Sequence, residues 1–180
     1  MIETFDNIFT EKVQSDIYLL AITAAYQIGW DDTSVFEHRQ FPCLHHRLTK
    51  QEWGQLDLIS RIQNQQLRDK IINEKFVSAT INLAVPSSIQ FPHSHNEPLV
   101  LLYYINMEWK NEYYGETLFY DEFAEEVVHT SIYKPGRCVL FDGKIAHSIR
   151  PSSHVAPQYR FTLFVSFDKK NFIEELKNIS

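Results

Sequence analysis

The spacing of hydrophobic residues changes near the middle of the chain. Before residue 76, apolar side chains recur every three or four positions, which is typical of amphipathic helices. One such pattern covers residues 13–27, just after Thr10, whose side chain can cap a helix. A second pattern covers residues 50–73. These patterns predict a helical first part, about residues 1–75.

From residue 76 onward the period is two, and the runs are short and rich in β-branched and aromatic residues. Glycine, proline, asparagine and aspartate separate them. The runs are FVSATINLAV, PLVLLYYINM, GETLFYD, VVHTSIY, GRCVLFD and QYRFTLFVSF. They predict an antiparallel sandwich or barrel over about residues 76–168, followed by a short closing helix at residues 171–180. The expected fold is therefore α+β, mainly β, with the N-terminal helices packed on one outer face of the barrel.

Composition narrows the class of protein. A chain of 180 residues fits one domain, residues 1–180, with one core. The net charge of −6 argues against nucleic acid as a partner, because that binding needs a basic surface. Two cysteines, Cys43 and Cys138, cannot form a disulfide framework. The N-terminus lacks the pattern of a signal peptide, and the apolar run at 99–105 is too short to cross a bilayer. We therefore expect a cytoplasmic protein without membrane contact.

Side chains that can bind a metal occur at two places in the β part. His93, His95 and Glu97 lie in FPHSHNEPLV, and His147 lies in DGKIAHSIRP. Alternate residues of a strand share a face, so His95 and Glu97 can point at one ion, and so can His93 and His95. We predict that His95, Glu97 and His147 hold the metal, as the two-histidine, one-carboxylate facial triad of non-haem Fe(II) oxygenases does. The His93/His95 alternative stays open, with His93 otherwise next to the ligands or on the substrate side.

A candidate anion site follows His147. Arg160 begins an alternating strand, so it shares a face with Thr162. A guanidinium group beside a hydroxyl suits a carboxylate, because the guanidinium can donate two charge-assisted hydrogen bonds. The distal carboxylate of 2-oxoglutarate requires such a partner. Arg150 is an alternative cation for this role.

Five segments together resemble the 2-oxoglutarate/Fe(II) oxygenases of the prolyl 4-hydroxylase-like group. In order they are similar to the family's first-ligand motif, tyrosine strand, Gly-Gly-Glu-like turn, distal histidine strand and Arg-x-Ser/Thr strand. The segments are HNE (95–97), LLYYINMEW (101–109), YGETLFYD (114–121), KPGRCVLFDGKIAHSIRP (134–151) and YRFTLFVSF (159–167). Any one of them alone has an ordinary structural explanation. Their order and spacing over half of the chain carry the resemblance.

The resemblance implies a double-stranded β-helix (jelly-roll) barrel and a set of cofactors. These are Fe(II), 2-oxoglutarate and O₂, with ascorbate in support. It implies hydroxylation of an unactivated C–H bond with release of succinate and CO₂. The implied substrate is a small molecule or a peptide, for example a free or peptidyl amino acid such as proline, and a homodimer is consistent with it. It also implies a tyrosine that donates a hydrogen bond to 2-oxoglutarate; strand alternation from His95 and Glu97 favours Tyr103 over Tyr104.

The sequence departs from the family pattern at two positions. Glu97 stands where the family usually has aspartate, and Tyr114 stands where the Gly-Gly pair begins. In the His93/His95 alternative the carboxylate is lost, which by the family's implication can leave a place for halide and so for halogenation. Two other classes remain. One is a cupin-like metalloenzyme that does not use 2-oxoglutarate, and the other is a non-catalytic binding jelly roll.

Overall fold

The computed structural model describes residues 1–29, 44–156 and 158–168. The helices are α1 (Glu11–Thr23), α3 (Lys50–Leu56), α4 (Leu58–Arg61), α5 (Gln65–Ile71) and the 3₁₀ helix η1 (Asn111–Tyr113). The strands are β1 (Ile2–Phe5), β2 (Gln27–Ile28), β3 (Leu44–Arg47), β4 (Lys75–Ala84), β5 (Leu99–Tyr104), β6 (Thr117–Tyr120), β7 (Val127–Ser131), β8 (Cys138–Phe141), β9 (His147–Ile149) and β10 (Arg160–Asp168). Cys43 and the expected closing helix at 171–180 lie outside the described residues.

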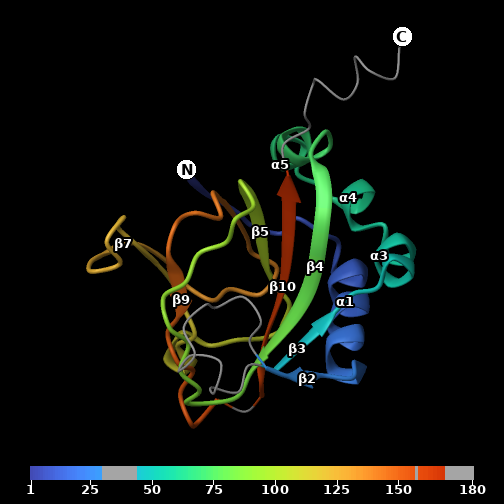
Figure 1. The fold of residues 1–180 in the computed structure, drawn as a ribbon. Coiled ribbons are helices and arrows are strands. Elements are labelled where there is room, and N and C mark those ends of the chain that lie inside the picture. The colour runs from blue at the N-terminus through green and yellow to red at the C-terminus, as the bar shows by residue number, and fades with distance from the viewer. Residues whose placement is uncertain (30–43, 157, 169–180) are drawn as a thin grey trace.

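Two antiparallel sheets form the body of the molecule. In the larger sheet the strand order is β1-β8-β5-β10-β4-β3-β2, and in the smaller it is β7-β6-β9. Figure 1 shows the helices α1, α3 and α4 on one side of β4 and β10, with β7 and β9 on the other side. The expected mainly β architecture, with helices on one outer face, is confirmed.

The alternation of the strands divides the core into two layers. One face of the larger sheet packs against the helices, for example through Ile81 and Leu163 against Ile17 of α1. The other face packs against the smaller sheet, for example through Leu102 against Phe119. Because neighbouring residues of a strand point to opposite faces, each long strand supplies side chains to both layers. This division decides which residues of β5 and β10 can reach the space between the sheets.

The first predicted helix forms, but over Glu11–Thr23 instead of the predicted residues 13–27. The hydroxyl of Thr10 accepts a hydrogen bond from the Val13 N–H at 3.3 Å, which caps α1. Val13, Ile17 and Ala21 lie four residues apart and are the buried residues of the helix. Their spacing places them on one face, against the larger sheet.

The second predicted helix, residues 50–73, was wrong as a single element. It is broken into α3, α4 and α5 because Asp57 has a left-handed backbone conformation, with φ 43° and ψ 44°. The Ser60 hydroxyl donates to the Asp57 carboxylate at 2.5 Å, and the Asn64 side chain accepts from the Leu67 N–H at 2.9 Å and starts α5. Polar side chains that bond to the nearby backbone compete with a continuous helix.

The segment between β4 and β5 leaves the larger sheet, crosses to the smaller one and returns. The Ser87 N–H donates to the Ser152 carbonyl at 2.8 Å. His93 and His147 form an antiparallel bridge, with N–H to carbonyl distances of 3.0 and 2.9 Å. The His95 N–H then donates to the Gly143 carbonyl at 2.7 Å before β5 begins. This path lays the first histidine segment beside the second.

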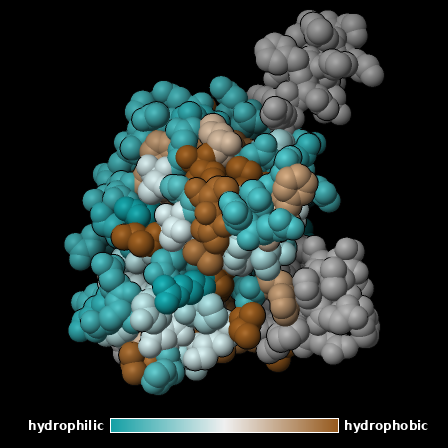
Figure 2. Space-filling model, turned by 90° about the vertical axis from the view of Figure 1, so that its left-hand side faces the viewer, coloured by the Kyte–Doolittle hydropathy of each residue, from teal (hydrophilic) through white to brown (hydrophobic). Residues whose placement is uncertain are grey.

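The outer strand of the smaller sheet carries exposed apolar residues. β7 pairs with β6 on one side, and Val127 and Val128 are 49% and 60% exposed. Figure 2 views the molecule from the side on which β7 and β9 lie in Figure 1, and shows apolar side chains among polar ones on this face. None of the helices in the described part of the chain has the length and apolar character needed to span a bilayer.

Candidate metal centre and co-substrate pocket

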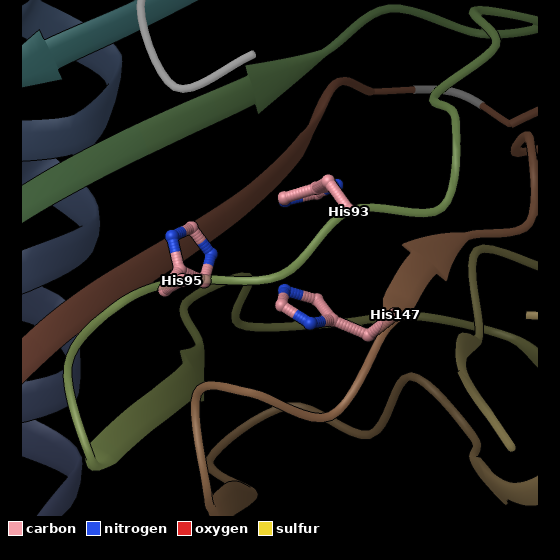
Figure 3. A group of neighbouring side chains, drawn as sticks. All are labelled: His93, His95 and His147. Atoms are coloured by element: carbon pink, nitrogen blue, oxygen red, sulfur yellow. The ribbon is translucent and has the colours of Figure 1, made fainter. Parts of the chain in front are cut away.

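Three imidazoles converge between the two sheets. His93 and His95 come from the crossing segment, and His147 is the first residue of β9. Potential ligand atoms of the three rings all lie within 4.8 Å of one another. The ring centroids are 4.5 Å apart for His93 and His147, and 5.2 Å apart for each of the other two pairs. Figure 3 shows the three side chains turned toward one shared space.

The hydrogen bonds of two rings select one tautomer. Nδ1 of His93 lies 3.0 Å from the Phe91 carbonyl, and Nδ1 of His147 lies 3.0 Å from the Ile145 carbonyl. A carbonyl oxygen only accepts, so in each ring Nδ1 carries the proton and donates it. In a neutral ring of this tautomer Nε2 carries the lone pair, as in histidines that bind metals.

The third ring has a buried nitrogen that lacks a partner in the described structure. Nε2 of His95 is buried and makes no hydrogen bond there. Burial, with a smaller contribution from neighbouring His93, lowers the pKa of His95 from 6.5 to about 3. Burial is also the main cause that holds the pKa of His147 well below its usual value. Both rings are therefore neutral at pH 7, and a metal ion would satisfy the nitrogen of His95.

The structure brings together the imidazoles of the His-Ser-His alternative. His95 and His147, common to both predicted ligand sets, lie in the cluster together with His93. Glu97 lines the same cavity, but its carboxylate is not among the groups within 4.8 Å of one another. The chain bends at residues 96–98 before β5, so strand alternation does not carry Glu97 to the face of His95.

Gly143 permits the close approach of the two segments that carry the cluster. A Cβ at this position would clash with the backbone carbonyl oxygen of Glu97 and would lie 3.3 Å from Cβ of His95. Gly143 therefore acts as a positioning residue for His95, because a larger residue must move one of the two segments.

Replacing Gly143 by alanine is expected to weaken metal binding by about tenfold or more and to cost about 1–3 kcal/mol of stability, the usual range for overpacking. A chelator titration and a thermal melt measure the two effects. The matched control is Gly54→Ala, because Gly54 lies in α3 with no neighbouring atom within 4 Å. That change should leave metal affinity unaltered and add about 0.5–1 kcal/mol of stability. Unchanged metal affinity in Gly143→Ala would contradict the positioning role.

A cavity of about 360 Å³ connects the cluster to the rest of the space between the sheets. Its wall joins residues of the larger sheet, the smaller sheet and the crossing segment. They are Gln27, Gly29, His45, Arg47, Ser78, Thr80, Asn82, Ala84, Gln90, His93, His95, Glu97, Leu102, Thr117, His147, Ser148, Ile149, Arg160, Thr162 and Phe164. The predicted residues Arg160 and Thr162 thus share one cavity with the histidines.

Arg160 is a buried cation that lines this cavity. Its side chain is 2% exposed, donates from Nε to the Gly115 carbonyl at 2.8 Å, and donates from one terminal nitrogen to the Thr117 hydroxyl at 3.3 Å. The rings of Tyr104 and Tyr133 lie beside the guanidinium, with centroids 5.6 and 4.8 Å away. No carboxylate of the described residues lies within ion-pair distance of it.

Burial lowers the pKa of Arg160, yet a guanidinium stays protonated in proteins. Glu116 acts electrostatically on this buried charge from beyond ion-pair distance, and the open cavity offers room for a closer anion. The alternative cation, Arg150, has a side chain that is 49% exposed, lies 3.6 Å from the Glu116 carboxylate and stacks on Tyr114. It does not line the cavity.

The prediction that Tyr103, and not Tyr104, faces the space between the sheets was wrong. Tyr103 packs in the helix-side layer, with its ring 5.1 Å from that of Phe9. Tyr104 lies in the layer between the sheets, where its hydroxyl donates to Thr117 at 2.9 Å. The bend at 96–98 separates the histidine segment from the strand, so the alternation starts anew at Leu99. A role of Tyr103 in binding 2-oxoglutarate stays a prediction that its position does not favour.

Sequence reasoning missed two aromatic residues of the site. The ring of Phe164 lies 4.5 Å from that of His95, and Tyr133 stacks beside Tyr104 near Arg160. Strand alternation could have identified Phe164, because it follows Arg160 and Thr162 on the same face of β10. Tyr133 ends the predicted run at 127–133 but lies after the end of β7, and nothing in that run indicated a place beside Arg160.

Comparisons with known proteins agree on the fold. A prolyl-4-hydroxylase from Pseudomonas putida superposes with a TM-score of 0.69 at 13% identity, over 93% of this chain and 92% of that one. A prolyl hydroxylase from Trichoplax adhaerens, solved with a peptide of hypoxia inducible factor, gives 0.68 at 14% identity, over 99% and 86%. HygX from Streptomyces hygroscopicus, solved with nickel and 2-oxoglutarate, gives 0.64 at 9% identity, over 95% and 84%.

Neither a family model nor a curated protein matches the sequence. The structural likeness at such low identity establishes architecture, and it agrees with the resemblance in the five sequence segments. This chain therefore has the jelly-roll fold of the 2-oxoglutarate/Fe(II) oxygenases of the prolyl 4-hydroxylase-like group.

Proposed function

We propose that this protein is a 2-oxoglutarate-dependent non-haem Fe(II) oxygenase that hydroxylates an unactivated C–H bond of a free or peptidyl amino acid. One observation carries the proposal. Three imidazoles converge in the same cavity that holds the buried guanidinium of Arg160, on a fold shared with such oxygenases. A metal site and an anion site in one cavity are the two features that this co-substrate needs.

His93, His95 and His147 are the proposed metal ligands. Imidazole nitrogen suits iron, and three ligands leave coordination positions for co-substrate and O₂. When bound, Fe(II) supplies the redox chemistry that couples the conversion of 2-oxoglutarate and O₂ to succinate and CO₂ with oxidation of the substrate. The carbonyls of Phe91 and Ile145 orient two of the rings. Phe164 packs against the third ring and keeps it in place.

Arg160 is the proposed partner of the distal carboxylate of 2-oxoglutarate, with Thr162 beside it on the same face of β10. The Gly115 carbonyl and the Thr117 hydroxyl hold the guanidinium in one orientation. A fixed fork loses little freedom on binding, which favours affinity. The low exposure of Arg160 removes competing water, so the charge-assisted bond forms in a medium that screens it weakly.

One observation favours a second function. The clustered ligands are all imidazoles, without the carboxylate of the facial triad, and such a set is compatible with a cupin-like metalloenzyme that does not use 2-oxoglutarate. In such an enzyme the buried Arg160 would have no co-substrate carboxylate to bind. The two functions therefore differ in whether 2-oxoglutarate binds.

Binding of 2-oxoglutarate to the anaerobic Fe(II) protein tests the proposal. A metal-to-ligand charge-transfer band is expected, and under air with ascorbate the protein should form succinate slowly without prime substrate. Absence of the band in a protein that binds Fe(II) would favour the cupin-like function. Failure to bind Fe(II) at all would favour a non-catalytic binding role.

A further inference from the structure

The face of the larger sheet that lines the cavity is divided into two halves. Toward β5 and β8 it is apolar, with Val100, Leu102 and Phe141 packed against the smaller sheet. Toward β3 and β4 it is polar, and Ser78, Thr80, Asn82, His45 and Arg47 line the cavity there. A polar floor that the smaller sheet does not cover is suited to a ligand that makes hydrogen bonds.

Arg47 is the cation of this polar half. It is the last residue of β3 and lies opposite Thr80 of β4. No carboxylate of the described residues is within ion-pair distance of it, although Glu97 lines the same cavity. A second cavity shares Arg47 and Ser78 with the first and is bordered by Lys50, Lys75 and the carboxylate of Asp168. Three cations and one carboxylate line that second cavity, so cations outnumber carboxylates around Arg47 in a chain whose net charge is −6.

The register of the sheet places Arg47 relative to the histidine cluster. Arg47 lies opposite Thr80, and Thr80 lies opposite Phe164, so the three form one row across β3, β4 and β10. The ring of His95 lies 4.5 Å from that of Phe164 at the end of this row. Two strand spacings, about 10 Å in all, separate the backbone of Arg47 from that of Phe164. The side chain of Arg47 extends into the cavity, so the space between its guanidinium and the histidine cluster is suited to a small molecule.

Arg160 approaches the cluster from another direction. It lies on the same strand as Phe164, four residues away, which corresponds to about 13 Å along β10. Arg47 lies across the strands instead. One small carboxylate cannot bind both guanidinium groups, so Arg47 remains available when Arg160 holds 2-oxoglutarate.

We propose that Arg47, with Ser78 and Thr80, binds a carboxylate of the prime substrate and thereby presents a carbon a few bonds away to the metal. This inference rests on the proposed function and names its substrate class, a carboxylic acid. The carboxylate is either that of a free acid or an acidic side chain of a peptide, and both would be recognised by the same charge-assisted hydrogen bonds. Arg47 is thus a specificity-determining residue, whereas Arg160 serves the co-substrate.

The test uses calorimetric binding to the anaerobic Fe(II) and 2-oxoglutarate complex of the full chain. The probes are the proteinogenic L-amino acids, the straight-chain acids from butyrate to octanoate, and short C-terminally amidated peptides that contain aspartate or glutamate. Each acid is paired with its primary amide, and each peptide with its asparagine or glutamine counterpart. Succinate formation under air is the second readout.

We expect at least one acid or acidic peptide to bind about tenfold or more tightly than its amide and to accelerate succinate formation. Arg47→Gln should reduce that preference to about twofold or less, and Arg47→Lys should retain part of it. Arg61→Gln, a change at the exposed end of α4, should leave the preference intact. All three variants should still give the charge-transfer band with 2-oxoglutarate alone.

Two outcomes would overturn the inference while the proposed function stands. One is a wild-type protein that gives the band but prefers no acid over its amide. The other is a preference that persists in Arg47→Gln. Loss of the band in the wild-type protein itself would instead remove the proposed function, and the inference with it. Preference for free acids or for acidic peptides identifies which source of the carboxylate the site takes.

Discussion

Replacing His93 by alanine is expected to lower the affinity for Fe(II) by about a hundredfold or more, while Glu97→Ala changes it by less than about threefold. The reason is geometric. Nδ1 of His93 donates to a backbone carbonyl, so Nε2 is the nitrogen suited to bind a metal, and the ring belongs to the cluster that the Glu97 carboxylate does not join. Losing a ligand should cost more than losing an outer partner, which typically costs about 10–100-fold. Anaerobic titration of Fe(II) against a chromogenic chelator measures both variants.

The same pair of variants distinguishes the two ligand sets that the sequence left open. If His95, Glu97 and His147 hold the metal, the order of the effects is reversed, and Glu97→Ala becomes the damaging change. His95→Ala should abolish binding in either case. His154→Ala is the matched control, because this histidine is exposed and lies outside the cluster and the cavity. Equal, small effects of His93→Ala and Glu97→Ala would contradict both assignments.

The second large effect is expected at Arg160. Arg160→Met should weaken 2-oxoglutarate binding by about a hundredfold or more, because truncating one partner of a buried charged pair costs about 2–5 kcal/mol. Fe(II) affinity should be unchanged, since the guanidinium is not among the groups of the metal cluster. The charge-transfer band, titrated with 2-oxoglutarate in the anaerobic Fe(II) protein, measures the change.

The melting temperature of Arg160→Met shows whether the loss of 2-oxoglutarate binding comes from the missing guanidinium or from unfolding of the variant. Arg160→Met removes two hydrogen bonds, to Gly115 and Thr117, but also a buried charge that has no ion-pair partner in the described part of the chain. These contributions oppose each other, so the variant should remain folded with a similar melting temperature. Arg150→Gln, at the exposed cation beside Glu116, is the control and should bind 2-oxoglutarate normally. An equal loss in Arg150→Gln would show that the anion site lies elsewhere.

Local patterns were sufficient for the order of the elements. The period of the apolar residues and the capping side chain of Thr10 are properties of neighbouring residues, and they correctly indicated α1 and the strands β4, β5, β6, β7, β8 and β10. The strands β1, β2 and β3 escaped prediction because they lie among helices in the part that the sequence predicted as helical, about residues 1–75. β9 escaped because three residues carry too little periodicity and form a strand only by pairing with β6. The left-handed Asp57 likewise divided a helix that its apolar spacing predicted as continuous.

By itself, the sequence indicated helices in the first part of the chain and an antiparallel β fold in the second. It also placed two histidine-bearing segments within the β part, and Arg160 and Thr162 on one strand face. Those features depend on residue types and on spacing within one element. Tertiary structure alone decided that His93 joins His95 and His147, that Tyr104 rather than Tyr103 lies near Arg160, and that Arg47 faces the same cavity. Each of these depends on where a non-strand segment bends and which strands become neighbours. Backbone pairing between residues far apart in the sequence decides the bends and the strand neighbours, and no local sequence pattern encodes that pairing.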